Sequence, residues 1–323
     1  MTVTEAIAAF FLHCRFEKNL STKTIKAYRI DLSQFTEWLQ TEKLHDGSIT
    51  ALDRDVIKRY LQTLFDFKPK TTKRKIATLK ALFNFLEFED HVVVNPFRKI
   101  KLKIREPRQL PTVMTVQEVQ KIFKHVYQLW QAEAKRNLYQ SKARLRDVAV
   151  LELLFATGIR VAELTHLRPQ EVNLEDGFVR VLGKGSKERM VHIGHDSTLA
   201  ILQLYFKTFQ EGIEATNYFF VNRLGNRLSE QSVRLMVKKY AEAVQIPKNI
   251  TPHIFRHTFA TLLLQEEVDI RFIQSLLGHA SINTTQIYAH VNPEHQRTLL
   301  RTRHPRRLFE GDPDSAEHLH HTK

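Results

Sequence analysis

The chain has 323 residues, of which 42% are hydrophobic, so it is long enough for two domains of ordinary size, each with its own core. Its 49 lysines and arginines exceed its 35 aspartates and glutamates by 14, and this surplus favours a polyanionic partner such as nucleic acid, with a basic cytosolic enzyme as the plainer alternative. A single cysteine, Cys14, excludes an intramolecular disulfide and a thiolate zinc cluster, and no apolar run approaches the ~18 residues of a membrane-spanning helix, so we expect a soluble, cytoplasmic protein without a membrane partner.

The first hundred residues read as helices joined by short turns. Apolar residues at helical spacing predict helices over residues 4–17, 21–39, 53–66 and 71–89. The last of these has one apolar face, and its other side and flanks are basic. We predict that this basic side lies against DNA phosphates, with an ordinary solvated helix face as the alternative. The predicted DNA-binding residues are Lys73, Arg74, Lys75, Thr78 and Lys80.

A proline-containing stretch without periodicity, "LKIREPRQLPTV" at 102–113, is the best linker in the sequence. It divides the chain into an N-terminal helical domain at 1–103, a linker at 104–113 and a second domain at 114–305. The polar, acidic end at 306–323 is predicted to be disordered.

The second domain opens with helices, including a long charged stretch at 124–146. A strand signal follows in "GFVRVLGKGSKERMVHIG", where apolar residues flank a Gly-Lys-Gly-Ser turn and predict a hairpin. Helical patterns then resume to about residue 301. Because the chain has only ten glycines and ten prolines, we predict a mainly α fold with a small antiparallel β-sheet.

The stretch "TPHIFRHTFATLL" gathers basic side chains at the start of a predicted helix. Thr251 can cap a helix that begins at Pro252, and His253, Arg256 and His257 then share one side of its first turns. The positive end of the helix dipole and its free N–H groups favour an anion there, most simply a phosphate. A zinc site on the two histidines is one alternative, but the arginine would repel the dication and no third ligand stands nearby. Solvated basic residues are the other alternative, although that places positive charge at the positive dipole end without compensation.

Two further stretches place polar side chains where helices or strands end. In "FATGIRVAELTHL", Gly158 can end one helix, and Arg160 can present its planar fork to a phosphate. A second short helix in that stretch contains Glu163. The predicted hairpin tip, "LGKGSK", carries Lys184, which is able to reach into a site. Each piece alone is a weak signal, since a lysine in a turn is usually solvated.

A last stretch, "LLGHASINTTQIYAHV", repeats the helix-end pattern, with Gly278 ending a helix, His279 following it and a short helix carrying Tyr288. Taken together, these pieces resemble the tyrosine recombinase (integrase) family, and its Xer-type members most of all. The resemblance spans roughly residues 146–306, through "LLFATGIRVAELTHLR", "VLGKGSKERMVHI", "TPHIFRHTFATLLL" and "IQSLLGHASINTTQIYAHV", followed by "HPR". The N-terminal half resembles the family's helical, SAM-like core-binding domain more loosely.

The resemblance implies a role for each of these residues. Arg160 and Arg256 would clamp the scissile phosphate, with Glu163 supporting the first arginine. Tyr288 would attack the phosphodiester, giving a 3′-phosphotyrosyl link and a free 5′-hydroxyl. The other implied catalytic residues are His253 as a candidate base, Lys184 as a candidate general acid and His279 at the phosphate, with His257 in a supporting structural place. No cofactor and no metal ion is implied, and we expect cleavage to proceed in EDTA.

The resemblance also implies a reaction and its partners. A site-specific recombinase of this family joins strands of double-stranded DNA at specific core sites, through a Holliday junction and as a homo-tetramer. A paralogous recombinase or an accessory protein is a further implied partner, and the implied location is the nucleoid. We expect the segment "NPEHQRTLLRTRHPRR" to pack into a neighbouring protomer, so truncation after Asn292 should weaken recombination and leave DNA binding.

Two other functions are compatible with parts of this pattern. One is relaxation of DNA by a type IB topoisomerase-like enzyme, and the other is a non-enzymatic DNA-binding regulator on the same fold. The small core-binding domain and the Xer-like stretches favour recombination over relaxation. The full set of six catalytic residues favours an enzyme over a regulator. The segment at 122–145 is longer than in compact Xer-type sequences, which leaves open a housekeeping or a mobile-element origin.

Overall fold

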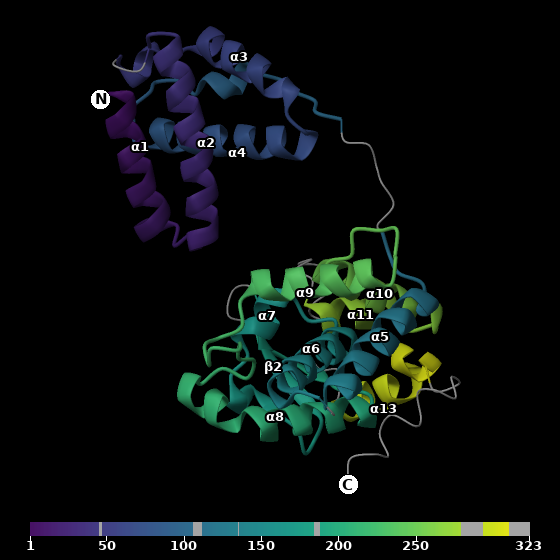
Figure 1. Cartoon of the computed structure of the whole chain (residues 1–323). Coiled ribbons are helices and arrows are strands. Elements are labelled where there is room, and N and C mark those ends of the chain that lie inside the picture. Colours follow the sequence, from purple (N-terminus) through teal and green to yellow (C-terminus); the bar gives the residue numbers. More distant parts are fainter. Residues whose placement is uncertain (45–46, 106–111, 135, 184–187, 279–292, 310–323) are drawn as a thin grey trace. The chain divides into compact units, whose positions relative to one another are not determined.

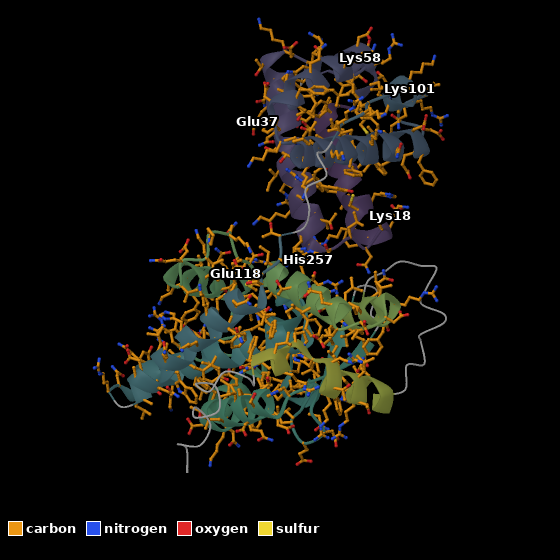
Figure 2. The ribbon with its side chains drawn as sticks, turned by 90° about the vertical axis from the view of Figure 1, so that its right-hand side faces the viewer. Lys18, Glu37, Lys58, Lys101, Glu118 and His257 are labelled. Carbon is orange, nitrogen blue, oxygen red and sulfur yellow. The ribbon has the colours of Figure 1, made fainter. Side chains whose placement is uncertain are left out.

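The computed structural model describes residues 1–44, 47–105, 112–134, 136–183, 188–278 and 293–309. The chain divides into two compact units, Met1–Gln109 and Leu110–Lys323, each with its own buried core (Figure 1). Both units are mainly helical, and the second also holds a small antiparallel sheet, so the predicted fold class is confirmed. Lysines such as Lys58 and Lys101 project from the first unit into solvent (Figure 2). Among the described residues, no helix is long and apolar enough to cross a membrane.

Helices with polar caps build the first unit. Thr2, Ser21 and Asp53 each accept a backbone N–H at the start of a helix, which fixes where that helix begins. The apolar faces of the helices meet in a core that includes the fully buried Phe35 and Phe83. The elements are α1 (Val3–Leu12), a π-helical turn (His13–Glu17), α2 (Thr22–Thr41), α3 (Arg54–Thr63), α4 (Pro69–Phe88) and 3₁₀ turns at Ile49–Ala51, Leu64–Asp66 and Pro96–Lys99.

The basic side of α4 is narrower than the sequence predicts. Lys75 and Thr78 are only 2% and 0% exposed, so the prediction that they lie on an open face is wrong. Thr78 Oγ1 donates to Asp31 Oδ2 at 2.9 Å, and Lys75 Nζ lies 3.7 Å from Asp31 Oδ1. The reason is that α1 and α2 both pack against α4, so its buried face is wider than its apolar stripe. The predicted residues that stay exposed are Lys73, Arg74 and Lys80.

The second unit is organised around α6. Residues 147–157 of this helix are all buried, as expected for the nearly all-apolar run "VAVLELLFA". Helices α5, α8, α9 and α10 pack around it. The helices are α5 (Val116–Ala134), α6 (Leu138–Thr157), α7 (Val161–His166), α8 (Asp196–Thr216), α9 (Glu230–Ala243), α10 (Pro252–Gln265), α11 (Ile270–Leu277) and α13 (Pro293–Arg303), with 3₁₀ turns at Pro169–Glu171 and Pro305–Phe309.

The sheet of the second unit has the antiparallel order β1 (Val172–Asn173), β2 (Phe178–Leu182) and β3 (Glu188–His192). Phe178 pairs with His192, and Leu182 pairs with Glu188, which confirms the predicted hairpin. The hairpin tip at 184–187 lies outside the described residues.

The C-terminal segment packs on its own unit. Leu300 and Phe309 belong to the core at 0% and 3% exposure, and the Phe309 ring stacks on Phe155 with 5.5 Å between centroids. The prediction of disorder from residue 306 onwards is therefore wrong for 306–309. The physical reason is that the apolar side chains of Leu300 and Phe309 complete the core of the unit. The expected packing of this segment into a neighbouring protomer stays a prediction.

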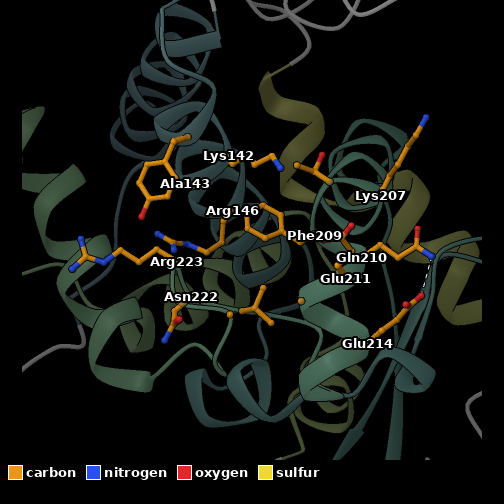
Figure 3. A pocket seen from close by; sticks show the side chains of 15 residues that line it. Lys142, Ala143, Arg146, Lys207, Phe209, Gln210, Glu211, Glu214, Asn222 and Arg223 are labelled. Atoms are coloured by element: carbon orange, nitrogen blue, oxygen red, sulfur yellow. Dashed lines mark hydrogen bonds between the residues drawn. The ribbon is translucent and has the colours of Figure 1, made fainter.

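An open pocket of about 600 Å³ lies where α6, α8 and residues 221–225 meet (Figure 3). Two of its basic side chains, Lys142 and Arg146, come from the first half of α6, and Lys142 also belongs to the longer segment at 122–145. None of the predicted site residues that the structure describes lines it. Its other charged side chains are Lys207, Glu211, Glu214 and Arg223.

Candidate active site

Gly158 ends α6 and turns the chain into α7. It adopts a left-handed conformation with φ of 60°, which favours glycine. A Cβ at this position would lie 2.5 Å from Phe259 Cδ1, so a side chain is excluded by space as well. The turn places Arg160 at the N-cap of α7. The position of this arginine therefore follows from the end of α6 at Gly158, which the sequence predicts.

Glu163 holds Arg160 at two points. Its Oε2 accepts the backbone N–H of Arg160 at 2.7 Å, and its Oε1 accepts from Arg160 Nη1 at 2.7 Å. Burial alone would raise the pKa of Glu163, but hydrogen bonds and charge from Arg189, and then from Arg160, hold it below its usual value. The carboxylate is thus ionised at neutral pH. The Arg160 side chain remains 42% exposed, so it is anchored at one side and accessible at the other.

Arg256 lies inside the unit. Thr251 caps α10 as predicted, yet Arg256 is only 4% exposed, so its predicted place on the solvent side with the histidines is wrong. Its Nη1 donates to Gly158 O at 2.8 Å and its Nη2 to Leu277 O at 2.5 Å, because the ends of α6 and α11 cover it. Burial, and then the charge of Arg160, lower the pKa of Arg256 to about 10. It still carries a full charge at neutral pH.

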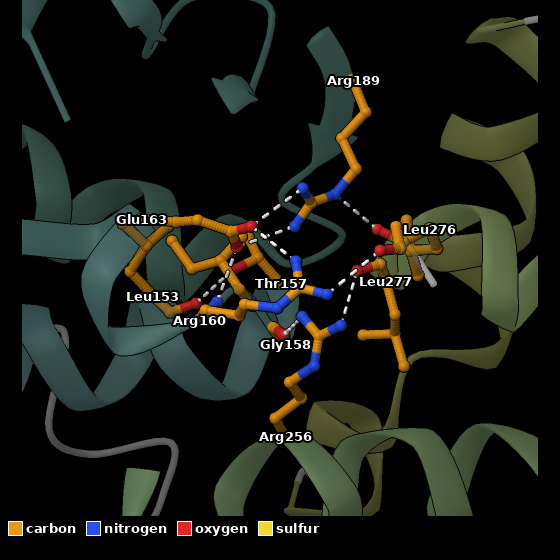
Figure 4. Close-up of polar contacts among 11 residues, drawn as sticks. Leu153, Thr157, Gly158, Arg160, Glu163, Arg189, Arg256, Leu276 and Leu277 are labelled. Carbon is orange, nitrogen blue, oxygen red and sulfur yellow. Dashed lines mark hydrogen bonds and ion pairs between the residues drawn. The ribbon is translucent and has the colours of Figure 1, made fainter. Parts of the chain in front are cut away.

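The C-terminal end of α11 presents three consecutive carbonyls to three different arginines (Figure 4). Such an end carries partial negative charge, which suits cations. Among the described carboxylates, only Glu163 bonds to these arginines. Positive charge therefore exceeds negative charge at a partly open position, which favours a bound anion. The three bonds are Arg189 Nε to Leu276 O at 3.0 Å, Arg256 Nη2 to Leu277 O at 2.5 Å and Arg160 Nη2 to Gly278 O at 3.0 Å.

His253 and His257 face each other one turn apart on α10. Their Nε2 atoms are 3.0 Å apart, and their ring centroids are 4.4 Å apart. Burial, and then the charges of His257, Arg256 and Arg160, lower the pKa of His253 below 6.5. His253 is therefore neutral at pH 7 and able to accept a proton. Among the residues that the structure describes, no three His, Cys, Asp or Glu side chains converge as metal ligands.

Three of the predicted catalytic residues, Lys184, His279 and Tyr288, lie outside the described residues. The sequence prediction did not include Arg189, which the structure joins to the site. The signal for it is the alternation along β3, since Arg189 shares a strand face with the fully buried Val191. An arginine on a core-facing strand position needs a carboxylate partner.

The chain is similar to known proteins along most of its length. Residues 112–295 match the sequence pattern of the family described as "Phage integrase family". Residues 7–90 match that of the "Phage integrase, N-terminal SAM-like domain". A protein named tyrosine recombinase from Agathobacter rectalis is 45% identical over 303 residues, which cover 94% of this chain and 97% of that protein. Tyrosine recombinase XerD from Staphylococcus saprophyticus is 36% identical over 305 residues, covering 93% and 98%. The crystal structure of XerH recombinase in a post-cleavage complex with palindromic difH substrate has a similar fold, with a TM-score of 0.64, 24% identity and coverage of 92% of this chain and 81% of that chain.

Proposed function

We propose, from the premise that this chain belongs to the phage integrase family of tyrosine recombinases, that its arginine cluster binds and cleaves a DNA phosphodiester. The chain is a site-specific recombinase of the Xer type. The observation that carries the proposal is the convergence of Arg160 and Arg256 on one helix end, with Glu163 as their nearby carboxylate. A phosphate entering beside the exposed part of Arg160 would receive charge-assisted hydrogen bonds at a site with surplus positive charge.

The bond changes assign tasks to three residues. The Tyr288 oxygen attacks phosphorus while the bond from phosphorus to the 5′ oxygen breaks, which yields a 3′-phosphotyrosyl link and a 5′-hydroxyl. A phenol has a pKa of about 10, so its proton needs an acceptor, and the neutral His253 is suited to take it. The leaving 5′ oxygen needs a proton, for which Lys184 is the candidate donor.

Charge that develops on the non-bridging oxygens is stabilised by Arg160 and Arg256, together with His279. Removing one preorganised donor of this kind typically costs roughly 3 kcal/mol, or a hundred- to thousandfold in rate. Because both arginines are already fixed by backbone carbonyls, and Arg160 also by Glu163, little reorganisation is needed as the charge appears.

The covalent link conserves the energy of the broken bond, so a 5′-hydroxyl of another duplex can reverse the attack and exchange strands. We place this reaction on double-stranded DNA with specific core sites, in a homo-tetramer that passes through a Holliday junction. A paralogous recombinase or an accessory protein is a further partner in this proposal, and the nucleoid is its location. In the first unit, the exposed Lys73, Arg74 and Lys80 are the proposed phosphate contacts.

The test offers the purified chain, in EDTA, a library of nicked suicide duplexes that trap cleavage intermediates. We expect a protein–DNA adduct on a denaturing gel, and sequencing of the attached strand gives the target site. Tyr288→Phe is the matched control, which should keep DNA affinity and lose the adduct. Tight binding without any adduct would favour a regulator, and relaxation of supercoiled DNA without exchange between duplexes would favour a topoisomerase-like activity.

A further inference from the structure

We infer that Arg189 is a positioning residue of the DNA-cleavage site, an inference that rests on the proposed function. Arg189 lies on β3, and its side chain is 13% exposed. Its Nη1 and Nη2 donate to the two carboxylate oxygens of Glu163 at 3.1 and 2.8 Å. Its Nε donates to Leu276 O at 3.0 Å. All three of its nitrogens thus bond to the protein, so Arg189 acts through its neighbours.

The neighbour through which it acts is Glu163. The same two oxygens of Glu163 hold the backbone N–H and the Nη1 of Arg160, each at 2.7 Å. A bidentate guanidinium fixes the plane of a carboxylate, and that plane sets the direction from which Arg160 bonds to it. A lysine at position 189 would keep the charge but could not hold both oxygens and a carbonyl in one fixed geometry.

Arg189 also joins three separate elements. Its backbone pairs with Val181 in the hairpin, and its guanidinium bonds to Glu163 near the start of α7 and to the last turn of α11. Space for it depends on Gly278, where a Cβ would lie 3.1 Å from Arg189 Nη1 and 3.3 Å from its Cζ. The small residue and the arginine therefore fit each other, and the loss of either would shift the end of α11 relative to Arg160.

The experiment compares single-turnover cleavage of the suicide duplex with DNA affinity. We expect Arg189→Gln to slow cleavage roughly 100-fold, since small misplacements at a reacting centre have effects of that size. Duplex affinity should change less than about threefold, because Arg189 makes no phosphate contact in this proposal. Arg189→Lys should fall between wild type and Arg189→Gln. In the double variant Arg189→Gln/Glu163→Gln, cleavage should be no slower than in the slower single variant, because both residues act as one unit.

The matched control is Arg180→Gln on the adjacent strand, where the arginine is exposed and bonds to one carbonyl, Gln170 O at 3.0 Å. Its cleavage rate should match wild type. Equal cleavage by wild type and Arg189→Gln, or additive losses in the double variant, would overturn the inference. Unfolding of both Arg189→Gln and Arg189→Lys, read by circular dichroism, would also overturn it in favour of a purely structural role. Absence of any adduct from wild type contradicts the proposed function itself, so the two failures are distinguishable.

Discussion

The guanidinium of Arg306 lies against the carboxylate of Glu152 in the interior of the second unit, with Nη2 2.9 Å from Oε1. Glu152 is 0% exposed and also accepts hydrogen bonds from Tyr127 at 2.8 Å and Thr198 at 2.6 Å. Burial alone would raise the pKa of Glu152, but Arg306, and then Thr198 and Tyr127, hold it below its ordinary value. Arg306 thus neutralises a buried charge in the C-terminal half of α6.

Arg306→Ala is expected to destabilise the second unit by about 3–5 kcal/mol, because it leaves a buried carboxylate without its cation. Thermal unfolding of the full chain measures the effect. The control is Arg307→Ala, whose arginine is exposed and should change stability little. Truncation after Asn292 should reproduce the loss, since it removes Arg306 together with Leu300 and Phe309. A truncated chain as stable as wild type would contradict the packing described above.

Stability is expected to fall with pH below about 6.5 because of His304. Its Nε2 donates to Ala156 O at 2.9 Å and its Nδ1 accepts from Arg306 N at 2.9 Å. A second ring proton, on Nδ1, would therefore point at the backbone N–H of Arg306. Burial lowers its pKa from 6.5 to about 4. The unfolded chain binds this proton first, so stability present above pH 6.5 is lost as the pH falls towards 4, by about 3 kcal/mol in total.

The measurement is denaturant unfolding between pH 7.5 and 4.5 for wild type and His304→Gln, which keeps a donor for Ala156 O but does not titrate. The wild-type curve should be steeper across this window, and parallel curves would exclude His304 as the cause. The pKa values of the buried carboxylates Glu152 and Glu163 are also lowered, so their contribution to stability is lost as the pH falls below the usual carboxylate range. This loss is the same in wild type and His304→Gln and does not affect the comparison.

Gly158→Ala should destabilise the second unit more than a left-handed backbone alone explains. The conformation itself costs about 1–2 kcal/mol for alanine, and the clash with Phe259 should add roughly 1–3 kcal/mol. Gly225→Ala is the matched control, because its φ is also positive, at 74°, and a Cβ there would have no neighbouring atom within 4 Å. Chemical unfolding of both variants checks the difference, and equal losses would show that the space around Gly158 is not limiting.

Lys73→Gln combined with Lys80→Gln should weaken DNA binding and reduce the slope of log affinity against log salt by roughly 2, if both side chains contact phosphates. Lys58→Gln, on an exposed position of α3, serves as the control and should leave the slope unchanged. Lys75→Met acts differently, because Lys75 is buried beside Asp31, and its effect should appear in stability. An unchanged slope in the double variant would remove the exposed side of α4 from the DNA contact.

Helix ends were the most predictable part of the site. Gly158, Gly278 and Thr251 mark their helix ends in the structure as the sequence indicates, because glycine and cap chemistry are local properties. The hairpin was predictable for the same reason, since alternation and a glycine-containing turn lie within a few residues of each other.

Burial of charged groups was not predictable in the same way. Lys75 and Arg256 were expected on open faces because a single helix does not show which other elements cover it. Arg189 and Arg306 find their carboxylates 26 and 154 positions away in the chain, so their roles depend on tertiary packing. Local patterns therefore locate the elements of the site, and packing decides which of its charges are paired.

The last turn of α11 gives the site a common point of assembly. Because Leu276, Leu277 and Gly278 each hold a different arginine, local fraying of this one turn would release three guanidinium groups together. The conformational entropy of the three side chains is therefore lost in one step, when that turn forms, and not separately for each side chain. The fraction of molecules with a complete arginine cluster therefore follows the folding equilibrium of this turn. Amide exchange at Gly278, whose N–H bonds to Ser275 O at 3.0 Å, measures that equilibrium directly.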